Sequence, residues 1–153
     1  MTEDMSHIED EIKKVQLEYI ESLSEKEDDF QRLLFSLSED ASKKELQLIS
    51  HKTAGSGGTY NCQAISKATR YLENILIDGS LVACDEEITN EFATKWLLYF
   101  HKLRDSYQKL ARYQFASTKE WSDALSKVDK ALDTQWDILE LKLVSLIQRK
   151  KCA

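Results

Sequence analysis

Proline is absent from this chain of 153 residues, and glycine occurs only four times. The tight turns of β-sandwiches and barrels depend on these two residues, because glycine supplies positive φ angles and proline fixes φ in advance. A chain with so few of them cannot easily make the many turns of an all-β fold. The composition therefore favours long helices joined by few connections.

Apolar residues recur at steps of three and four along the chain, which is the spacing of one helical face. The chain is therefore predicted to fold as an all-α bundle with antiparallel neighbours. Gly79 stands where a helix C-terminus favours glycine, and Ser24 with Glu27 matches a capping box that would start a new helix. The expected helices cover residues 6–23, 24–37, 41–56 and 62–78, a fifth helix after Asp85, and a sixth over about 118–149.

Two sets of apolar residues at helical spacing define the expected faces. The first helix carries a stripe of Ile8, Ile12, Val15, Tyr19 and Leu23. The aromatic residues predicted to lie in the core are Trp96, Tyr99, Phe100, Tyr107, Tyr113, Trp121 and Trp136. The sixth helix could pair with a second copy, but Ile138, Leu141, Val144 and Ile147 make its apolar face too broad for a narrow coiled-coil seam. We expect it to pack within its own chain, in a single domain spanning residues 1–153, and a monomer is favoured over a dimer.

The formal net charge of −6 argues against a nucleic-acid or anionic-membrane partner, because phosphate binding needs a basic face. No apolar run approaches the roughly 20 residues of a membrane span, and a cytoplasmic location is expected. Cys62, Cys84 and Cys152 are odd in number and lack metal-ligand spacing, so we expect reduced thiols and no metal site.

Three of the four glycines gather in the stretch HKTAGSGGTY, residues 51–60. Either the helix ends near Ser56 and the glycines turn the chain, or they keep one helical surface bare. With 3.6 residues per turn, the core face comprises Leu46, Ile49, Thr53, Gly57 and Tyr60. His51 points away from it, with small neighbours at Ala54, Gly55 and, if the helix persists, Gly58. This clearing would make the imidazole accessible to a bulky partner. His7 lies in a charged N-terminal stretch, and His101 follows an aromatic run without such small neighbours, so both are expected to be structural or neutral.

The same stretch, followed by Ile65, Ser66, Ala68, Leu72 and Glu73, resembles bacterial histidine phosphotransfer (HPt) domains. Their pattern is a histidine, a glycine four residues later, small residues and a second helix that ends in Leu-Glu. The resemblance covers about residues 8–110. It implies a four-helix bundle with a core of about 8–115, here with an additional N-terminal helix and a long C-terminal extension over 118–149.

The resemblance implies that His51 carries a phosphoryl group between response-regulator receiver domains, in a relay that starts from a hybrid sensor histidine kinase. Imidazole is a known covalent nucleophile and is partly neutral near pH 7. Gly55, Ala54 and Gly58 would make room for the donor, and Ser56 would fix the neighbouring backbone. Lys52, Lys67 and Arg70 are candidate counter-charges.

Other features of the sequence limit the chemistry expected of this chain. It has no phosphate-binding glycine loop, no kinase motif set and no acidic pocket assignable to Mg²⁺. We therefore expect a phosphocarrier rather than an enzyme, with Mg²⁺ and the aspartyl phosphate on the partner receiver domain.

Two departures from the HPt pattern keep alternatives open. Many members carry lysine at the position of Ala54, and the sixth helix exceeds the usual length. The chain could instead be an adaptor or inhibitor that binds a receiver or kinase without phosphotransfer, or a helical dimerisation module.

Overall fold

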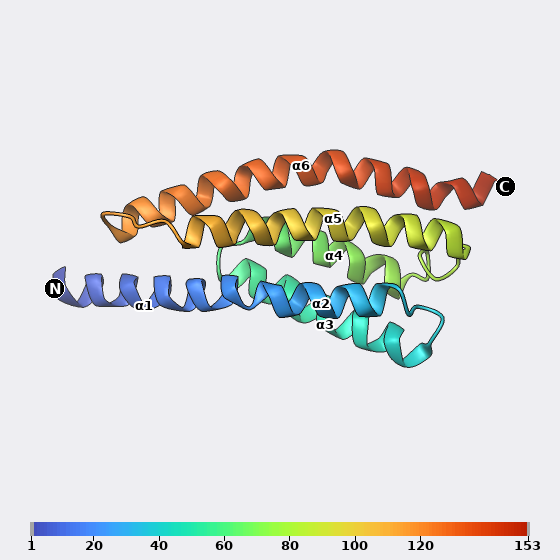
Figure 1. The fold of residues 1–153 in the computed structure, drawn as a ribbon, viewed down its shortest axis with the longest axis horizontal. Coiled ribbons are helices and arrows are strands. Elements are labelled where there is room, and N and C mark those ends of the chain that lie inside the picture. The colour runs from blue at the N-terminus through green and yellow to red at the C-terminus, as the bar shows by residue number, and fades with distance from the viewer. Residues whose placement is uncertain (1, 153) are drawn as a thin grey trace.

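The computed structural model describes the backbone of residues 2–152 and the side chains of residues 7–149. All regular elements in this part of the chain are helices, which confirms the predicted all-α class (Figure 1). They are α1 (Thr2–Glu21), α2 (Leu23–Leu34), α3 (Asp40–Thr59), α4 (Gln63–Ile77), α5 (Glu86–Ala111) and α6 (Thr118–Cys152). Gly79 follows α4 with a φ of 78°, as the predicted C-terminal cap requires.

The helices lie roughly side by side in one elongated bundle (Figure 1). α1 and α2 follow each other along almost one line (Figure 1). In this view α3 runs below α2, its antiparallel partner α4 lies between α2 and α5, and the long α6 lies above α5. α3 packs most extensively on α4, and α6 packs on α5 and α4. Since α3 continues to Thr59, the alternative in which it ends near Ser56 is wrong.

The core is rich in aromatic rings contributed by several helices. Phe30 lies 4.9 Å from Trp96 and 5.2 Å from Phe100, measured between ring centroids. The indole of Trp96 also donates a hydrogen bond to the carbonyl of Ala68 on α4, at 3.1 Å. The aromatic residues predicted to be buried are buried, with the exception of Tyr113, which is exposed beyond the end of α5.

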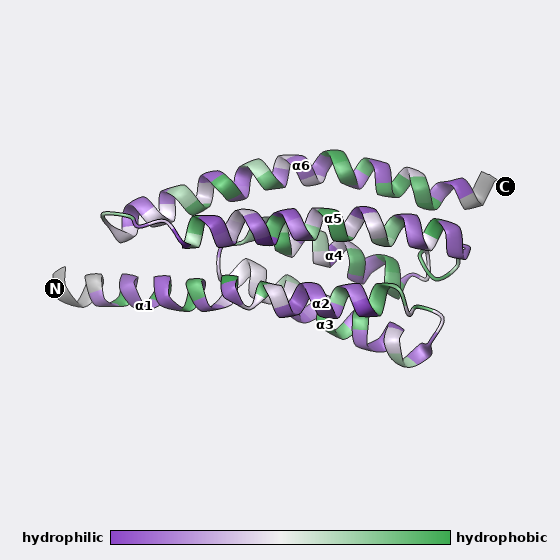
Figure 2. Ribbon diagram, viewed as in Figure 1, coloured by the Kyte–Doolittle hydropathy of each residue, from purple (hydrophilic) through white to green (hydrophobic). Residues whose placement is uncertain are grey.

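Not every predicted apolar stripe is covered. On α1, Tyr19 is buried, but Ile8, Ile12 and Val15 are exposed. On α6, Ile147 is buried, while Ile138 and Leu141 are exposed, so these two do not widen the packed face as expected. Hydrophobic (green) and hydrophilic (purple) residues alternate along the helices (Figure 2). Within the described residues, none of the helices combines the length and hydropathy that a bilayer span requires.

The predicted capping box at Ser24 and Glu27 is wrong. α2 begins at Leu23, and its N-cap residue Ser22 makes no capping hydrogen bond through its side chain. Ser24 instead accepts a hydrogen bond from the Gln108 amide at 3.0 Å, and the carboxylate of Glu27 lies 3.0 Å from Nδ1 of His101. Both side chains are used to hold α2 against α5 rather than to start a helix.

A buried carboxylate of α6 caps the N-terminus of α4. Oδ1 of Asp129 accepts a hydrogen bond from the backbone N–H of Ala64 at 2.9 Å and another from the hydroxyl of Tyr107 at 2.6 Å. Burial, together with the nearby thiol of Cys62 and the Asp129 carboxylate, raises the pKa of Tyr107, so the phenol remains a donor. One side chain thereby joins α4, α5 and α6.

We expect Asp129→Ala to lower the free energy of unfolding by about 2 kcal/mol or more, because two buried donors lose their acceptor. The exposed Asp123 on the same helix is the matched control, and Asp123→Ala should change the free energy by no more than about 0.5 kcal/mol. Urea unfolding followed by circular dichroism measures both. Equal stability of the two variants would contradict the assigned role of Asp129.

Candidate functional site

His51 lies near the middle of α3 with 72% of its side chain exposed. Its Nδ1 atom is 2.7 Å from Oε2 of Glu73 on α4, whose side chain is only 16% exposed. An exposed ring is thus held on one edge by a largely buried carboxylate. This pairing fixes the orientation of a side chain that would otherwise sample several rotamers in solvent.

The pairing also determines which ring nitrogen is available for chemistry. An ionised carboxylate can only accept a hydrogen bond, so Nδ1 of His51 must donate one. In the neutral imidazole, the proton therefore resides on Nδ1 and the lone pair on Nε2. The arrangement leaves the lone pair that a nucleophile requires on the remote nitrogen, Nε2.

A close approach of α3 and α4 brings His51 and Glu73 together. A Cβ atom at Gly57 would lie 3.0 Å from the backbone nitrogen of Ser66 and 3.1 Å from the carbonyl oxygen of Cys62. The hydroxyl of Ser66 donates a hydrogen bond to the carbonyl of Ala54 at 2.8 Å. Glycine at position 57 is therefore required by the contact between the two helix backbones.

Gly55 has a different environment, although it is only two residues away. A Cβ atom there would meet nothing within 4 Å, and the residue is exposed one turn after His51. Gly58 is partly exposed, with the Ser66 hydroxyl 3.8 Å from where its Cβ would be. These two positions agree with the predicted clearing. Ala54 does not, because it is buried against α4. The prediction that Ala54 lies on the open face beside His51 is therefore wrong.

Alanine substitutions should separate the two kinds of glycine. Gly57→Ala should lower the free energy of unfolding by about 1–3 kcal/mol, because the added methyl group meets backbone atoms that cannot move aside. Gly55→Ala should raise it by about 0.5–1 kcal/mol, since alanine favours the helix and the space is open. Thermal and urea unfolding measure both changes. If both substitutions raised the free energy of unfolding, helix propensity alone would determine the effect, and the close backbone contact assigned to Gly57 would be contradicted.

The candidate counter-charges have different surroundings. Nζ of Lys67 lies 2.7 Å from Asp133 and 3.9 Å from Asp137 on α6, and the hydrogen bond to Asp133 raises the pKa of Lys67. This lysine is therefore directed away from α3. Arg70 lies one turn before Glu73 on α4, and its Nη2 atom is 3.5 Å from the Ser66 hydroxyl that contacts α3. Lys52 is exposed beside His51 on α3 itself.

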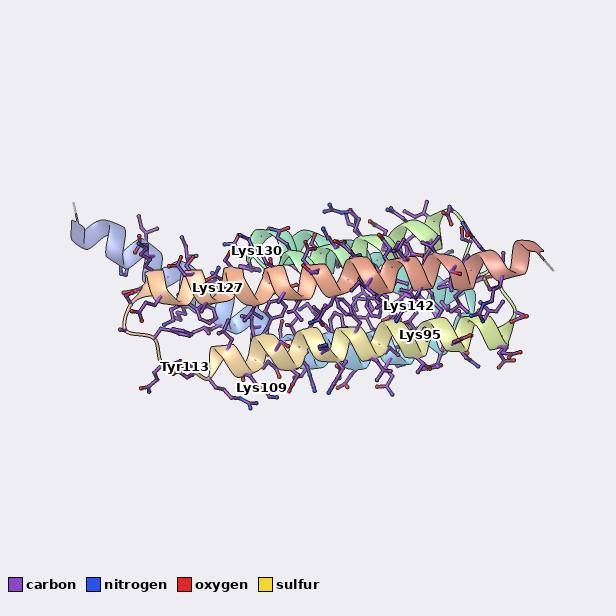
Figure 3. All side chains as sticks on the ribbon, turned by 90° about the horizontal axis from the view of Figure 1, so that it is seen from above. Lys95, Lys109, Tyr113, Lys127, Lys130 and Lys142 are labelled. Carbon is purple, nitrogen blue, oxygen red and sulfur yellow. The ribbon has the colours of Figure 1, made fainter. Side chains whose placement is uncertain are left out.

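Many of the other cations lie on a separate face. Figure 3 shows Lys95 and Lys109 on α5 and Lys127, Lys130 and Lys142 on α6. Figure 1 places α3 and α6 on opposite sides of the bundle. Of the three candidate counter-charges, Lys52 and Arg70 are the two that the carboxylates of α6 do not hold in the part of the chain that the structure describes.

Ser56 hydrogen-bonds the backbone, as predicted, but on the side of α1. Its hydroxyl lies 3.3 Å from the carbonyl oxygen of Thr53 and 3.2 Å from the hydroxyl of Tyr19. Burial raises the pKa of Tyr19, so that phenol is protonated at neutral pH. Ser56 therefore supports α3 against α1 and does not contact His51 in this structure.

His101 resembles His51 in its exposure and in its contact with a glutamate, but its other surroundings differ. Its Nδ1 atom lies 3.0 Å from Oε1 of Glu27, but Nη2 of Arg104 lies 3.1 Å from the same ring nitrogen. No glycine occurs on α5, so no cleared surface surrounds this ring. His101 thus provides a natural control for His51, since both rings are exposed and both contact a glutamate.

Sequence reasoning did not assign a role to Glu73, the residue that orients His51. It was noted only as part of a Leu-Glu pair at the end of a helix. The sequence feature that could have indicated this pair is the predicted helix hairpin. Antiparallel helices joined by a short turn bring residues that are far apart in the sequence, such as His51 and Glu73, close together. The pairing becomes specific only once the register of α3 against α4 is known.

The described side chains contain no group of three or more His, Cys, Asp or Glu residues placed to hold a metal ion. Cys62 is buried, and burial raises the pKa of its thiol to about 12. The side chain of Cys152 lies outside the described residues.

No protein-family model matches the chain, and no match emerges among curated proteins or solved structures.

Proposed function

We propose that the chain is a histidine phosphotransfer protein in which His51 accepts a phosphoryl group from a receiver-domain aspartyl phosphate and passes it to another receiver. The observation that carries the proposal is the exposed imidazole whose Nδ1 contacts Glu73 at 2.7 Å, beside the open surface at Gly55. The all-helical bundle and the HPt-like pattern of α3 and α4 support it. In this proposal the chain is a phosphocarrier rather than an enzyme.

The chemistry follows from the orientation of the ring. Nε2 of His51 attacks phosphorus as the bond from phosphorus to the aspartyl oxygen breaks, and the electron pair leaves with the aspartyl carboxylate. The ring retains its proton on Nδ1 and gains a positive charge. The carboxylate of Glu73 stabilises that charge at the atom where it develops. Mg²⁺, if required, belongs to the receiver domain.

Preorganisation is the main contribution of this chain. Phosphoryl transfer depends chiefly on in-line placement and on electrostatic stabilisation of the transferred group. Glu73 limits the motion of the nucleophile, and the missing side chain at Gly55 permits a partner to approach closely. Arg70 and Lys52 supply positive charge toward the phosphoryl oxygens.

His51→Gln should abolish labelling by phosphoramidate, a small phosphodonor that favours histidine. The wild type should give an acid-labile shifted band on a phosphate-affinity gel. His101→Gln should label like the wild type, since that variant retains His51 and removes the other glutamate-paired histidine. Labelling that persists in His51→Gln, or disappears in His101→Gln, would contradict the assignment.

Failure of the wild type to label, together with tight binding to a receiver domain, would instead favour the adaptor alternative. The buried alanine at position 54 is the observation that favours this second candidate, because the cation present in many HPt domains is missing there. Light scattering at several concentrations tests the dimerisation module, which requires a mass that rises toward that of two chains.

The two cations of α4 offer a matched test of the counter-charge. Arg70→Gln should slow phosphorylation of His51 about fivefold, which corresponds to roughly 1 kcal/mol for a solvent-exposed charge near a phosphoryl group. Lys67→Gln should leave the rate nearly unchanged, because Asp133 holds that lysine. Single-turnover rates of His51 phosphorylation in the two variants, measured at low salt, test this difference. A slower rate in Lys67→Gln with an unchanged rate in Arg70→Gln would contradict the role of Arg70.

A further inference from the structure

The N-terminal half of α1 presents an apolar face that the bundle leaves exposed in large part. Ile8, Ile12, Val15 and Tyr19 follow one another at steps of four, three and four, and therefore lie along one line of the helix. Tyr19 is only 7% exposed, but Val15, Ile12 and Ile8 are 39%, 50% and 56% exposed. We call Ile8, Ile12 and Val15 the α1 stripe. The stripe begins one turn before Tyr19, the last residue on this line that its neighbours bury.

The end of α3 explains why coverage stops there. The ring of Tyr19 packs 4.8 Å from that of Tyr60, directly after the last residue of α3, and its hydroxyl contacts Ser56. α1 projects beyond this point, whereas the chain turns back from α3 into α4 (Figure 1). The α1 stripe therefore continues the face that contacts α3 into a region where α3 is no longer present.

Other contacts hold this part of α1 in place against the bundle. The indole of Trp121 donates a hydrogen bond to Gln16 at 2.8 Å, and the Gln16 amide donates one to the carbonyl of Tyr60 at 3.3 Å. Thr118 donates a hydrogen bond to Asp10 at 2.9 Å. α1 is thus anchored on α6 and on the α3–α4 turn, and Ile12 of the stripe borders a groove that Gln16, Thr118 and Trp121 also line. The uncovered face is preformed rather than part of a loose tail.

The charges beside the stripe indicate what can cover it. Glu9, Glu11 and Glu18 are exposed on α1, and the helix as a whole carries seven acidic residues against two lysines. A second copy would bring the same excess of negative charge to an α1–α1 contact, which disfavours self-association. A segment with an apolar face flanked by lysine or arginine complements both the stripe and the acidic residues.

We propose that the α1 stripe binds a basic amphipathic helix of a partner protein, which continues the bundle beyond the end of α3. The occupant takes the position that α3 would hold if it were longer. This surface is separate from His51, so the proposal holds whether or not His51 carries phosphate.

The test uses three synthetic 18-residue peptides as probes. The first has leucines at helical spacing with lysines on the other face, the second replaces the lysines with glutamates, and the third scrambles the leucine–lysine order so that no apolar face forms. Calorimetric titration should give one-to-one binding of the first peptide only. Amide shifts in the nuclear magnetic resonance spectrum should be concentrated in residues 8–19.

Ile8→Ser combined with Ile12→Ser should weaken binding of the first peptide at least tenfold. Leu98→Ser is the matched control, because Leu98 is 67% exposed on α5, and this variant should bind like the wild type. Equal binding of the scrambled or glutamate peptide, unchanged binding by the double variant, or no binding of the first peptide would overturn the proposal. A wild-type dimer in sedimentation that Ile12→Ser dissociates would identify a second copy as the occupant and also overturn it.

Discussion

The close contact between α3 and α4 determines most of what this chain can do. Gly57 lets the backbones of the two helices meet at distances that a methyl group would not permit. The hydrogen bond from Ser66 to Ala54 holds the same contact along the helices. Because the register is fixed there, Glu73 reaches Nδ1 of His51. Without this contact, His51 would be one exposed histidine among several.

The bundle separates a rigid interior from an adaptable outer surface. Asp129 joins the N-terminus of α4 to α5 and α6, and the aromatic core supports the same helices from within. His51 and the α1 stripe lie on the exterior of this scaffold, where side chains are small, apolar or oriented by one buried partner. Such a division is expected for a protein that acts by docking, since rigid elements position groups more accurately than loops do.

The helical class and most helix positions could be predicted from apolar spacing, because a helix that buries one face must repeat at 3.6 residues. The same periodicity places Gly57 on the core face and Gly55 on the exposed side with His51, and the structure agrees. It could not show that the backbone of α4 approaches Gly57 so closely that no Cβ atom fits there. The pairing of Glu73 with His51 also required the register of two helices. The exposure of Ile12 arises from where α3 ends, which the pattern of α1 does not encode.

The orientation of the His51 ring is the central claim, and the protonation of its two nitrogens tests it most directly. Nitrogen-15 resonance of the imidazole distinguishes the two neutral forms, at a pH where the ring is uncharged. We predict that His51 carries its proton on Nδ1 in the wild type and that Glu73→Ala shifts the ring toward the Nε2-protonated form. A wild-type ring protonated on Nε2, with Nδ1 as its lone-pair nitrogen, would contradict the account.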